Sequence, residues 1–544
     1  MASSSGTAIV GRALSGASML AGVQVLSRVL TLLLNVALAR ALDDPSALGI
    51  SAVQLYLLNT FTLTLAREGV RRTGLRLAAD AQNSSDRLAE LIRLAWFAVA
   101  AGFVLTPIIC AYFIHEVDEV ALGGVSIGDY IYSVQITGLA VVVELLSEPM
   151  FIAAQVDLRY GARSAIEAFA VTTRCVVQFV GVVGLNLNLS AFAYGYLSYG
   201  VCLLASYLLL FCKSPCGLSI VVPQLFIKQH RDSSSSGSLT ALAASMSLQQ
   251  VFKVMLQEGE KLVMMGLRMG ATDQAVYSLV FNLGSIVVRF LFLPLEESAY
   301  AVFGKLNDMA QQGKESDIPL VRIAPVAVRV MSLVGLVFAS FGPSFSHLLL
   351  ALMYGPKWSE KTHAPSVLAA YCYYVGFVAV NGITEAFVHA VGDDEVVRGL
   401  NKWLLFFSVV YIATAVALFP FGAYGLILAN CFSMSLRIMF SVSFIAKWKD
   451  PLSGERIGGM ASLFPSLTTI VGFIGAAVLL ATSEDMVYKG FSFGDTLLWP
   501  SAAAHVGVGV SCLAGTLALL FVSSERELLQ ELVAIRAMVR SKTD

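Results

Sequence analysis

Long apolar segments alternate with short polar connections along almost all of the 544 residues. A helix needs about 20 mostly apolar residues to cross a bilayer. About fourteen segments meet this requirement, at roughly 15–40, 45–66, 89–114, 130–155, 161–185, 190–211, 241–267, 273–302, 323–348, 364–390, 401–419, 422–446, 460–482 and 499–522. The pattern predicts an all-α polytopic membrane protein with about fourteen transmembrane helices.

Composition narrows the class of protein further. Hydrophobic residues make up 57% of the chain and charged residues 13%, against about a quarter charged in soluble domains. A soluble enzyme, a disordered chain and a coiled coil are therefore excluded, and the net charge of −1 gives no basic field for nucleic acid. The eight cysteines lie mostly in apolar segments, so no metal and no cofactor are expected. No Walker motif or catalytic Ser/His/Asp set is found, which indicates a transporter rather than an enzyme.

The distribution of Lys and Arg predicts the orientation. With fourteen spans, the connections on one side hold about 22 positive residues, whereas the other side holds only Arg40, Arg268, Lys357, Lys361 and Lys489. Positive residues concentrate on the cytosolic side of membrane proteins. Both termini are therefore expected in the cytosol.

Three short patterns recur six spans apart, in the same order. Gln24-Val25 is echoed by Gln250-Val251, Asn59 by Asn282, and Glu148 by Glu385. Repeated halves are typical of transporters. The echoes predict a six-helix lobe over 1–211, a flexible Ser-rich cytosolic linker over 212–240 and a second six-helix lobe over 241–446. Two additional transmembrane helices over 447–522 and a cytosolic amphipathic tail over 523–544 complete the predicted organisation.

Many charged and polar residues fall inside the predicted spans, where each costs several kcal/mol unless it faces protein or water. At helical spacing they form stripes, which we expect to line a shared aqueous cavity. They are Gln24, Arg28, Glu144, Glu148, Lys253, Gln257, Glu260, Asn282, Arg289, Glu296 and Glu385. Pro149 and Pro294 interrupt two of these spans, as a hinge or as a plain kink.

Two interpretations of the charges stay open. They can pair structurally, as Arg28 or Lys253 with Glu144, or Arg289 with Glu258. Alternatively, Arg28, Lys253 and Arg289 bind an anion such as a diphosphate, because Arg forms fork-like bonds with phosphate oxygens. Arg67, expected at the cavity mouth, is either part of an ordinary positive anchor or a ligand that captures phosphate from the cytosol.

Several stretches resemble the eukaryotic Rft family. They are Leu65-Ala-Arg-Glu-Gly-Val-Arg-Arg72, Val143-Glu-Leu-Leu-Ser-Glu-Pro149, Leu256-Gln-Glu-Gly-Glu-Lys261, Asn282-Leu-Gly-Ser-Ile-Val-Val-Arg289, Pro294-Leu-Glu-Glu-Ser-Ala-Tyr300, Asn381-Gly-Ile-Thr-Glu385 and Leu428-Ala-Asn-Cys-Phe432. The resemblance covers nearly the whole chain, and is weakest over 212–240 and after about 450.

The resemblance implies a fold of the superfamily that includes multidrug exporters and bacterial lipid-linked sugar flippases: two pseudo-symmetric lobes around a V-shaped central cavity. It further implies an endoplasmic reticulum membrane protein of N-glycosylation, whose substrate is a dolichyl-diphosphate heptasaccharide moved from the cytosolic to the luminal leaflet. By similarity to the bacterial relatives, Arg28, Arg67 and Arg289 would hold the diphosphate.

Three functions remain to be compared. The first is a glycolipid flippase with alternating access, in which Arg28, Arg67, Lys253 and Arg289 bind the diphosphate and the carboxylates hold the lobes or exchange protons. The second is a non-transporting scaffold or chaperone that presents the glycolipid to other proteins of the glycosylation pathway. The third, an ion-coupled exporter of organic cations, is disfavoured because a cation site needs net carboxylate charge rather than cavity cations.

Overall fold

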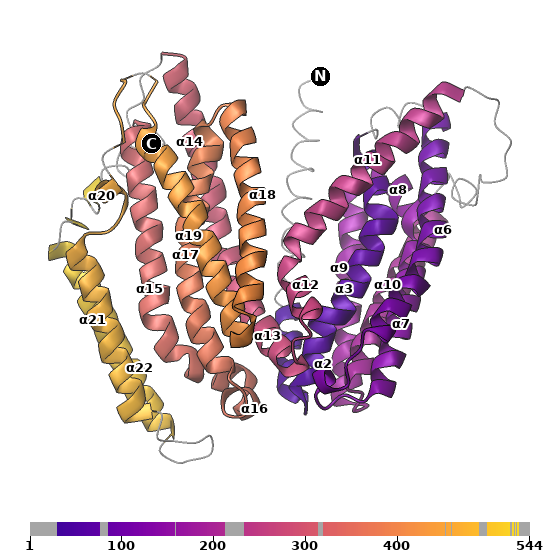
Figure 1. Cartoon of the computed structure of the whole chain (residues 1–544), viewed down its shortest axis with the longest axis horizontal. Helices are drawn as coiled ribbons and strands as arrows, with labels where there is room; N and C mark the ends of the chain where they lie inside the picture. Colours follow the sequence, from indigo (N-terminus) through magenta and orange to yellow (C-terminus); the bar gives the residue numbers. More distant parts are fainter. Residues whose placement is uncertain are drawn as a thin grey trace, which may run out of the picture. The chain divides into compact units, whose positions relative to one another are not determined.

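The computed structural model of the chain describes residues 30–76, 85–157, 159–212, 233–313, 319–451, 453–457, 460–488, 498–522, 525, 526, 528, 530 and 531. Its internal contacts divide the chain into two compact units, Met1–Ala275 and Val276–Asp544. Figure 1 shows each unit as a bundle of long helices. In the described residues the only β-type pairing is one isolated bridge, between Lys449 and Arg456.

Twelve helices in the described residues are long and apolar enough to cross a membrane. Each coincides with a predicted span, so the chain is a multi-span membrane protein. The first remaining predicted span, 15–40, is described only from Leu30, as a helix to Ala41. The second, 241–267, falls on α11 and α12, which are not among the twelve helices. The count of fourteen therefore stays a prediction.

Besides the helix Leu30–Ala41, the first unit contains eleven α-helical segments, two π-helical turns and one 3-10 turn in the described residues. They are α2 Pro45–Ile50, η1 Ser51–Leu55, α3 Tyr56–Leu63, η2 Thr64–Glu68, α4 Gly69–Arg76, α6 Ser85–His115, η3 Val120–Leu122, α7 Ile127–Leu145, α8 Glu148–Val156, α9 Tyr160–Val183, α10 Leu189–Cys212, α11 Ser233–Gln257, α12 Gly259–Gly266 and α13 Ala271–Val287. Helix α13 crosses the boundary into the second unit.

The second predicted span is one continuous rod built from α2, η1, α3, η2 and α4. Its start is fixed locally: the Asp44 carboxylate accepts a hydrogen bond from the Ser46 N–H at 2.9 Å, and Pro45 occupies the first turn, where its missing N–H costs nothing. Helix α4 then packs against α6, α8 and α11. The rod is therefore an internal element of the first unit.

The fourth predicted span is interrupted at its proline. Helix α7 ends at Leu145, and α8 begins at Glu148 with Pro149 in its first turn. Proline is tolerated there because first-turn N–H groups have no intrahelical partner. Ile152 and Phe151 of α8 are buried in a core formed with α6 and α10 residues such as Leu91 and Tyr207. The break therefore lies inside the packed unit.

The second unit continues with seven α-helices of eight residues or more, two short α-helices, two π-helical turns and one 3-10 turn in the described residues. They are η6 Val288–Phe292, α14 Leu293–Gln311, α15 Leu320–Tyr354, α16 Pro356–Ser359, α17 Ala364–Val391, α18 Asp394–Ala417, η7 Phe419–Phe421, α19 Ala423–Lys447, α20 Met460–Leu463, α21 Leu467–Ser483, η8 Glu484–Tyr488 and α22 Leu498–Val522. Helix α17 is central, because α14, α15 and α19 all pack against it.

The last two membrane helices dock on α15. Helix α21 packs against both α15 and α22. The buried His505 of α22 joins all three helices: its Nδ1 lies 3.0 Å from the Ser483 hydroxyl, and its Nε2 lies 3.1 Å from the Ser344 carbonyl oxygen. A buried imidazole needs such partners, so His505 fixes the place of this helix pair.

The predicted linker over 212–240 is partly helical in the structure, and much of it and of the predicted tail lies outside the described residues. The Ser-rich run was expected to belong to a flexible linker ending at 240, but α11 begins at Ser233. The helix that forms over the following Leu- and Ala-rich residues extends back through the serines, because a helix propagates more easily than it nucleates. Residues 213–232 and most of the predicted tail, 523–544, lie outside the described residues.

The boundary between the compact units lies after Ala275, later than the predicted lobe boundary at 241. The intervening helix α11 packs against α4 and η2. Gly69 allows this close approach, because a Cβ there would lie 1.9 Å from the Ser247 hydroxyl and 2.7 Å from the Ser247 nitrogen. The division into two six-helix lobes stays a prediction.

Candidate functional site

Two of the predicted diphosphate ligands lie on π-helical turns. Arg67 is on η2 and Arg289 is on η6. Such turns are rare and often occur at functional sites. The turns start 224 residues apart, at Thr64 and Val288, within one residue of the offset between Asn59 and Asn282. This correspondence favours the predicted internal repeat.

Arg67, Arg71, Glu144 and Glu148 form a buried four-charge cluster in the first unit. Arg71 binds Glu148 through two hydrogen bonds, Nε to Oε1 at 2.6 Å and Nη2 to Oε2 at 2.7 Å. The Nη2 of Arg67 lies 2.7 Å from Glu144 Oε1, and its Nη1 lies 3.7 Å from Glu148 Oε2. Two positive and two negative charges balance, as buried charges require.

Aromatic and amide groups enclose this four-charge cluster. The Arg71 guanidinium carbon lies 3.8 Å from the centroid of the Phe151 ring, and that of Arg163 lies 4.7 Å from the same centroid. Cations gain about 0.5–2 kcal/mol over such a ring. The Gln155 side-chain amide donates to the Arg71 carbonyl oxygen at 3.3 Å. Helices α4, α8 and α9 are therefore held together at one point.

Arg67 was expected at a cavity mouth, but it is buried, with 7% of its surface exposed. Its Nε and Nη1 have no hydrogen-bond partner in the part of the chain that the structure describes. Among the described residues Glu144 pairs with Arg67 and not with Lys253, whereas the alternative pairing with Arg28 lies outside the described residues and stays a prediction. The physical reason is that the π-helical turn points the arginine of η2 at α7. The role of Arg67 as an anion ligand stays a prediction.

The predicted polar stripe of α11 and α12 is divided between exposed and paired residues. Lys253 and Gln257 are exposed, and Lys253 makes no ion pair with any described residue. Glu260 is half-buried. Glu258 pairs with Lys261 and accepts a hydrogen bond from the Tyr56 hydroxyl at 2.8 Å. The expected pairing of Glu258 with Arg289, a residue of the other compact unit, stays a prediction.

A second charged group lies in the second unit, around Glu385 of α17. Its Oε2 accepts a hydrogen bond from Arg437 Nη2 of α19 at 2.6 Å and one from the Asn381 amide at 3.0 Å. Glu296 of α14 lies against the same helix, because a Cβ at Gly382 would lie 1.7 Å from its Oε1. Arg437 is thus paired with Glu385, and a second carboxylate, Glu296, lies on the neighbouring helix α14.

Arg289 and Asn282 are exposed on η6 and α13. Arg289 has no ion-pair partner among the residues that the structure describes. The remaining predicted ligands, Gln24 and Arg28, lie outside the described residues. The structure therefore joins Arg67 with Glu144 and Glu148 and places Glu296 beside the helix that carries Glu385. Lys253 and Arg289 have no counter-charge among the described residues.

Sequence reasoning missed three members of these groups. Arg71 was named only within one of the stretches that resemble the Rft family, and Gln155 and Arg437 were not considered. The signal for Arg437 is present, since it is the only charged residue in α19 before the last turn and a charge inside a span marks a functional or paired site. Gln155 gives no such signal, because a neutral amide in a helix is common.

The fold is that of membrane transporters with the architecture of lipid flippases and multidrug exporters. It matches the inward closed conformation of the lipid II flippase MurJ with a TM-score of 0.56 over 94% of this chain and 99% of that chain, at 11% identity. It also matches an inward-facing multidrug resistance MATE family transporter of the MOP superfamily, with a TM-score of 0.51 over 76% and 94% of the two chains, at 12% identity.

The chain belongs to the Rft protein family, whose model matches residues 12–535. Three similar relatives carry the name Man(5)GlcNAc(2)-PP-dolichol translocation protein RFT1. The Dictyostelium discoideum protein is 30% identical over 92% of this chain and 93% of its own. The Xenopus tropicalis and Mus musculus proteins are 32% and 31% identical, each over 93% of both chains.

Proposed function

We propose that the protein translocates a dolichyl-diphosphate heptasaccharide across the endoplasmic reticulum membrane, from the cytosolic to the luminal leaflet, by alternating access. The names of the family relatives support this substrate, and the transporter fold supports translocation. In this proposal both termini face the cytosol. The protein acts as a transporter and catalyses no covalent step.

The observation that carries the proposal is Arg289, an exposed and unpaired arginine on a π-helical turn in a membrane span. An arginine at the centre of a span costs about 2.5–3.5 kcal/mol on insertion scales when it faces lipid. This cost favours a position beside water or an anionic headgroup. A guanidinium binds diphosphate oxygens through parallel N–H bonds, so Arg289 supplies the recognition that a diphosphate needs.

Lys253 supplies a second uncompensated cation in the first unit, on the helix that packs against η2. Arg67 contributes differently. Glu144 already neutralises it, yet its Nε and Nη1 keep unused hydrogen-bond donors. We assign Arg67 a secondary role: it donates to a phosphate oxygen when the four-charge cluster rearranges. In this proposal Arg28 completes the diphosphate ligands.

The carboxylates have structural roles in this proposal. Glu144 and Glu148 hold Arg67 and Arg71, and Glu385 holds Arg437. Glu296 and Glu385 on neighbouring helices also provide a place for proton exchange, because two nearby carboxylates do not ionise independently. Gln24, Gln257, Glu260 and Asn282 would complete the polar lining.

N-glycan maturation in cells that depend on this protein tests the proposal. Arg289→Ala should abolish maturation while the protein is still made and inserted. Arg289→Lys should restore part of the maturation, because lysine restores the positive charge but not the two parallel hydrogen bonds of arginine. The matched control is Arg398→Ala, which removes another exposed arginine at the start of a span. Normal maturation with Arg289→Ala would contradict the site and favour a scaffold, in which cavity cations are dispensable.

A further inference from the structure

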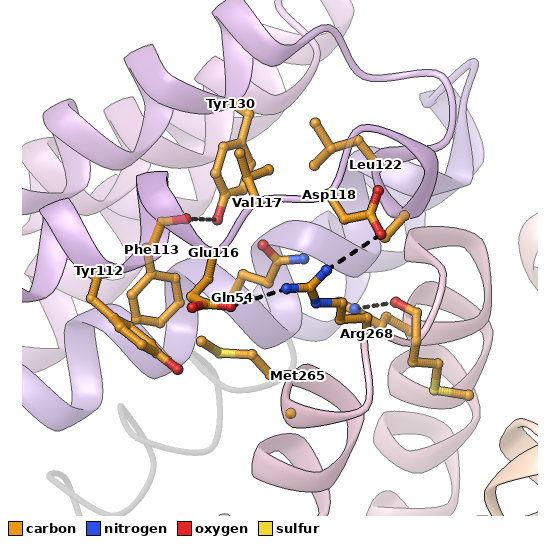
Figure 2. A pocket seen from close by; sticks show the side chains of 14 residues that line it. Gln54, Tyr112, Phe113, Glu116, Val117, Asp118, Leu122, Tyr130, Met265 and Arg268 are labelled. Atoms are coloured by element: carbon orange, nitrogen blue, oxygen red, sulfur yellow. Dashed lines mark hydrogen bonds and ion pairs between the residues drawn. The ribbon is translucent and has the colours of Figure 1, made fainter.

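A polar pocket opens at one end of the first unit, away from the four-charge cluster. It has a volume of about 90 Å³. Its lining comes from the end of α6 and the connection after it, from η1 and α7, and from the end of α12, the following loop and the start of α13. Figure 2 shows Gln54, Glu116, Asp118 and Arg268 around its centre, with Tyr112, Phe113 and Tyr130 along one side.

Gln274 is the pocket residue whose hydrogen bonding is incomplete. It is 1% exposed, and its Nε2 donates to the Met269 carbonyl oxygen at 2.7 Å. Its Oε1 has no hydrogen-bond partner among the described residues. An unsatisfied buried acceptor costs about 1–3 kcal/mol. A donor that enters the pocket would recover this energy, so the orphaned oxygen points to a ligand with O–H or N–H groups.

Arg268 precedes Met269, which Gln274 contacts, and has a strained backbone conformation. Its φ is 54°, a region that costs a non-glycine residue about 1–3 kcal/mol. Its Nη2 lies 3.2 Å from Glu116 Oε2, and its Nη1 lies 3.9 Å from Asp118 Oδ2. All three side chains are more than a third exposed, and exposed ion pairs contribute only about 0–1 kcal/mol. Stability alone therefore does not explain an arginine here.

The charges of Arg268, Glu116 and Asp118 indicate which class of ligand the pocket can bind. Arg268 is already bound by two carboxylates, so an anion finds no free cation. No group of three metal-ligating side chains exists in the described residues, so a metal ion is not favoured. Each carboxylate still has acceptor sites, because an ionised carboxyl offers about four. Acceptors beside aromatic rings suit a neutral hydroxyl-bearing ring, whose O–H groups donate while its C–H face packs on an aromatic side chain.

We infer that this pocket binds a sugar ring of the oligosaccharide headgroup. The inference rests on the proposed function, which supplies the glycan. A volume of about 90 Å³ corresponds to about three water molecules, so the pocket accepts the hydroxyl edge of one terminal sugar rather than the whole glycan. Gln274 accepts from one hydroxyl, Asp118 or Glu116 accepts from another, and Tyr112 or Phe113 packs against the ring.

Binding of the free heptasaccharide, which lacks diphosphate and dolichol, tests the inference. The probe is five mannoses on two N-acetylglucosamines, titrated calorimetrically into the purified full chain in lipid nanodiscs. Gln274→Met should raise the Kd at least tenfold, and Asp118→Asn should raise it several-fold. Asn retains the cap that Asp118 Oδ1 provides to the Val120 N–H, so this second variant keeps the loop. The matched control Glu119→Gln, exposed in the same loop and outside the pocket, should stay within twofold.

The complete glycolipid separates this inference from the proposed function. If wild type binds the glycolipid but not the free heptasaccharide, or if Gln274→Met and Asp118→Asn bind both as wild type does, the pocket holds only water and the inference is overturned. Binding of the free heptasaccharide that only these two variants lose supports it. If wild type binds neither molecule, the proposed function fails together with the inference.

Discussion

Glu148→Gln is expected to destabilise the protein strongly. Glu148 is fully buried and binds Arg71 through two hydrogen bonds. The substitution keeps the shape but leaves two buried arginines with one carboxylate, Glu144. Removing one partner of a buried ion pair costs about 3–5 kcal/mol. Glutamine still accepts one hydrogen bond, so we expect the lower half of that range.

Glu68→Gln is the matched control for this substitution. Glu68 lies one turn before Arg71 and approaches Arg67 only to 4.0 Å, with 30% of its side chain exposed. A pair of this kind contributes less than about 1 kcal/mol. A second control, Glu148→Gln with Arg71→Gln, removes both charges and should recover about 1–3 kcal/mol by coupling between contacting residues.

Unfolding by dodecyl sulfate in mixed micelles, followed by far-UV circular dichroism, measures the free energies of unfolding of the four proteins. The expected order is wild type and Glu68→Gln close together, the double variant lower, and Glu148→Gln lowest. The reasoning would be refuted if Glu148→Gln and Glu68→Gln lost the same free energy, because the four charges would then not depend on one another.

Three further predictions concern other residues. Gly69→Ala should destabilise the protein by about 1–3 kcal/mol, because the new Cβ would lie 1.9 Å from the Ser247 hydroxyl. The control Gly304→Ala, with nothing within 4 Å of the new Cβ, should leave the melting temperature unchanged or raised. Equal losses of stability in the two variants would exclude a tight contact at Gly69. Glu385→Gln should lower the free energy of unfolding by about 1–3 kcal/mol, because Arg437 loses its carboxylate partner. His389 lies 3.8 Å from Glu385 and is 36% exposed, so His389→Gln should lower it by less than about 1 kcal/mol. Thermal unfolding of both variants checks the difference. Arg289→Ala should change stability by no more than about 0.5 kcal/mol, since the residue is exposed and unpaired, and a large loss in the same assay would show that Arg289 is structural.

The extents of the spans were predictable from the sequence because length and apolarity alone decide whether a helix can cross a bilayer. The break before Pro149 was predictable for a similar reason, since proline removes a backbone donor wherever it occurs. The start of the helix Ser233–Gln257 was harder to predict from the sequence, because both linkers and the first turns of helices are rich in serine. These features depend on local sequence.

Which charged side chains pair with one another inside the spans was less predictable from the sequence. Glu144 meets Arg67 because of how the second and fourth spans are rotated, and packing sets that rotation. The π-helical turns at η2 and η6 each insert an extra residue per turn, which rotates every following side chain away from a regular helical stripe. A prediction that assumes 3.6 residues per turn therefore places residues before and after a π-helical turn on the same helix face although they lie on different faces.

Leaflet transfer of a labelled dolichyl-diphosphate heptasaccharide in liposomes is the most direct test of the central claim. Purified wild type is compared with Arg28→Ala/Arg289→Ala and with Arg398→Ala. The proposed function predicts transfer by wild type and Arg398→Ala and loss of transfer by the double variant. Absence of transfer by well-folded wild type, or equal transfer by all three proteins, would contradict a translocation mechanism that depends on these arginines.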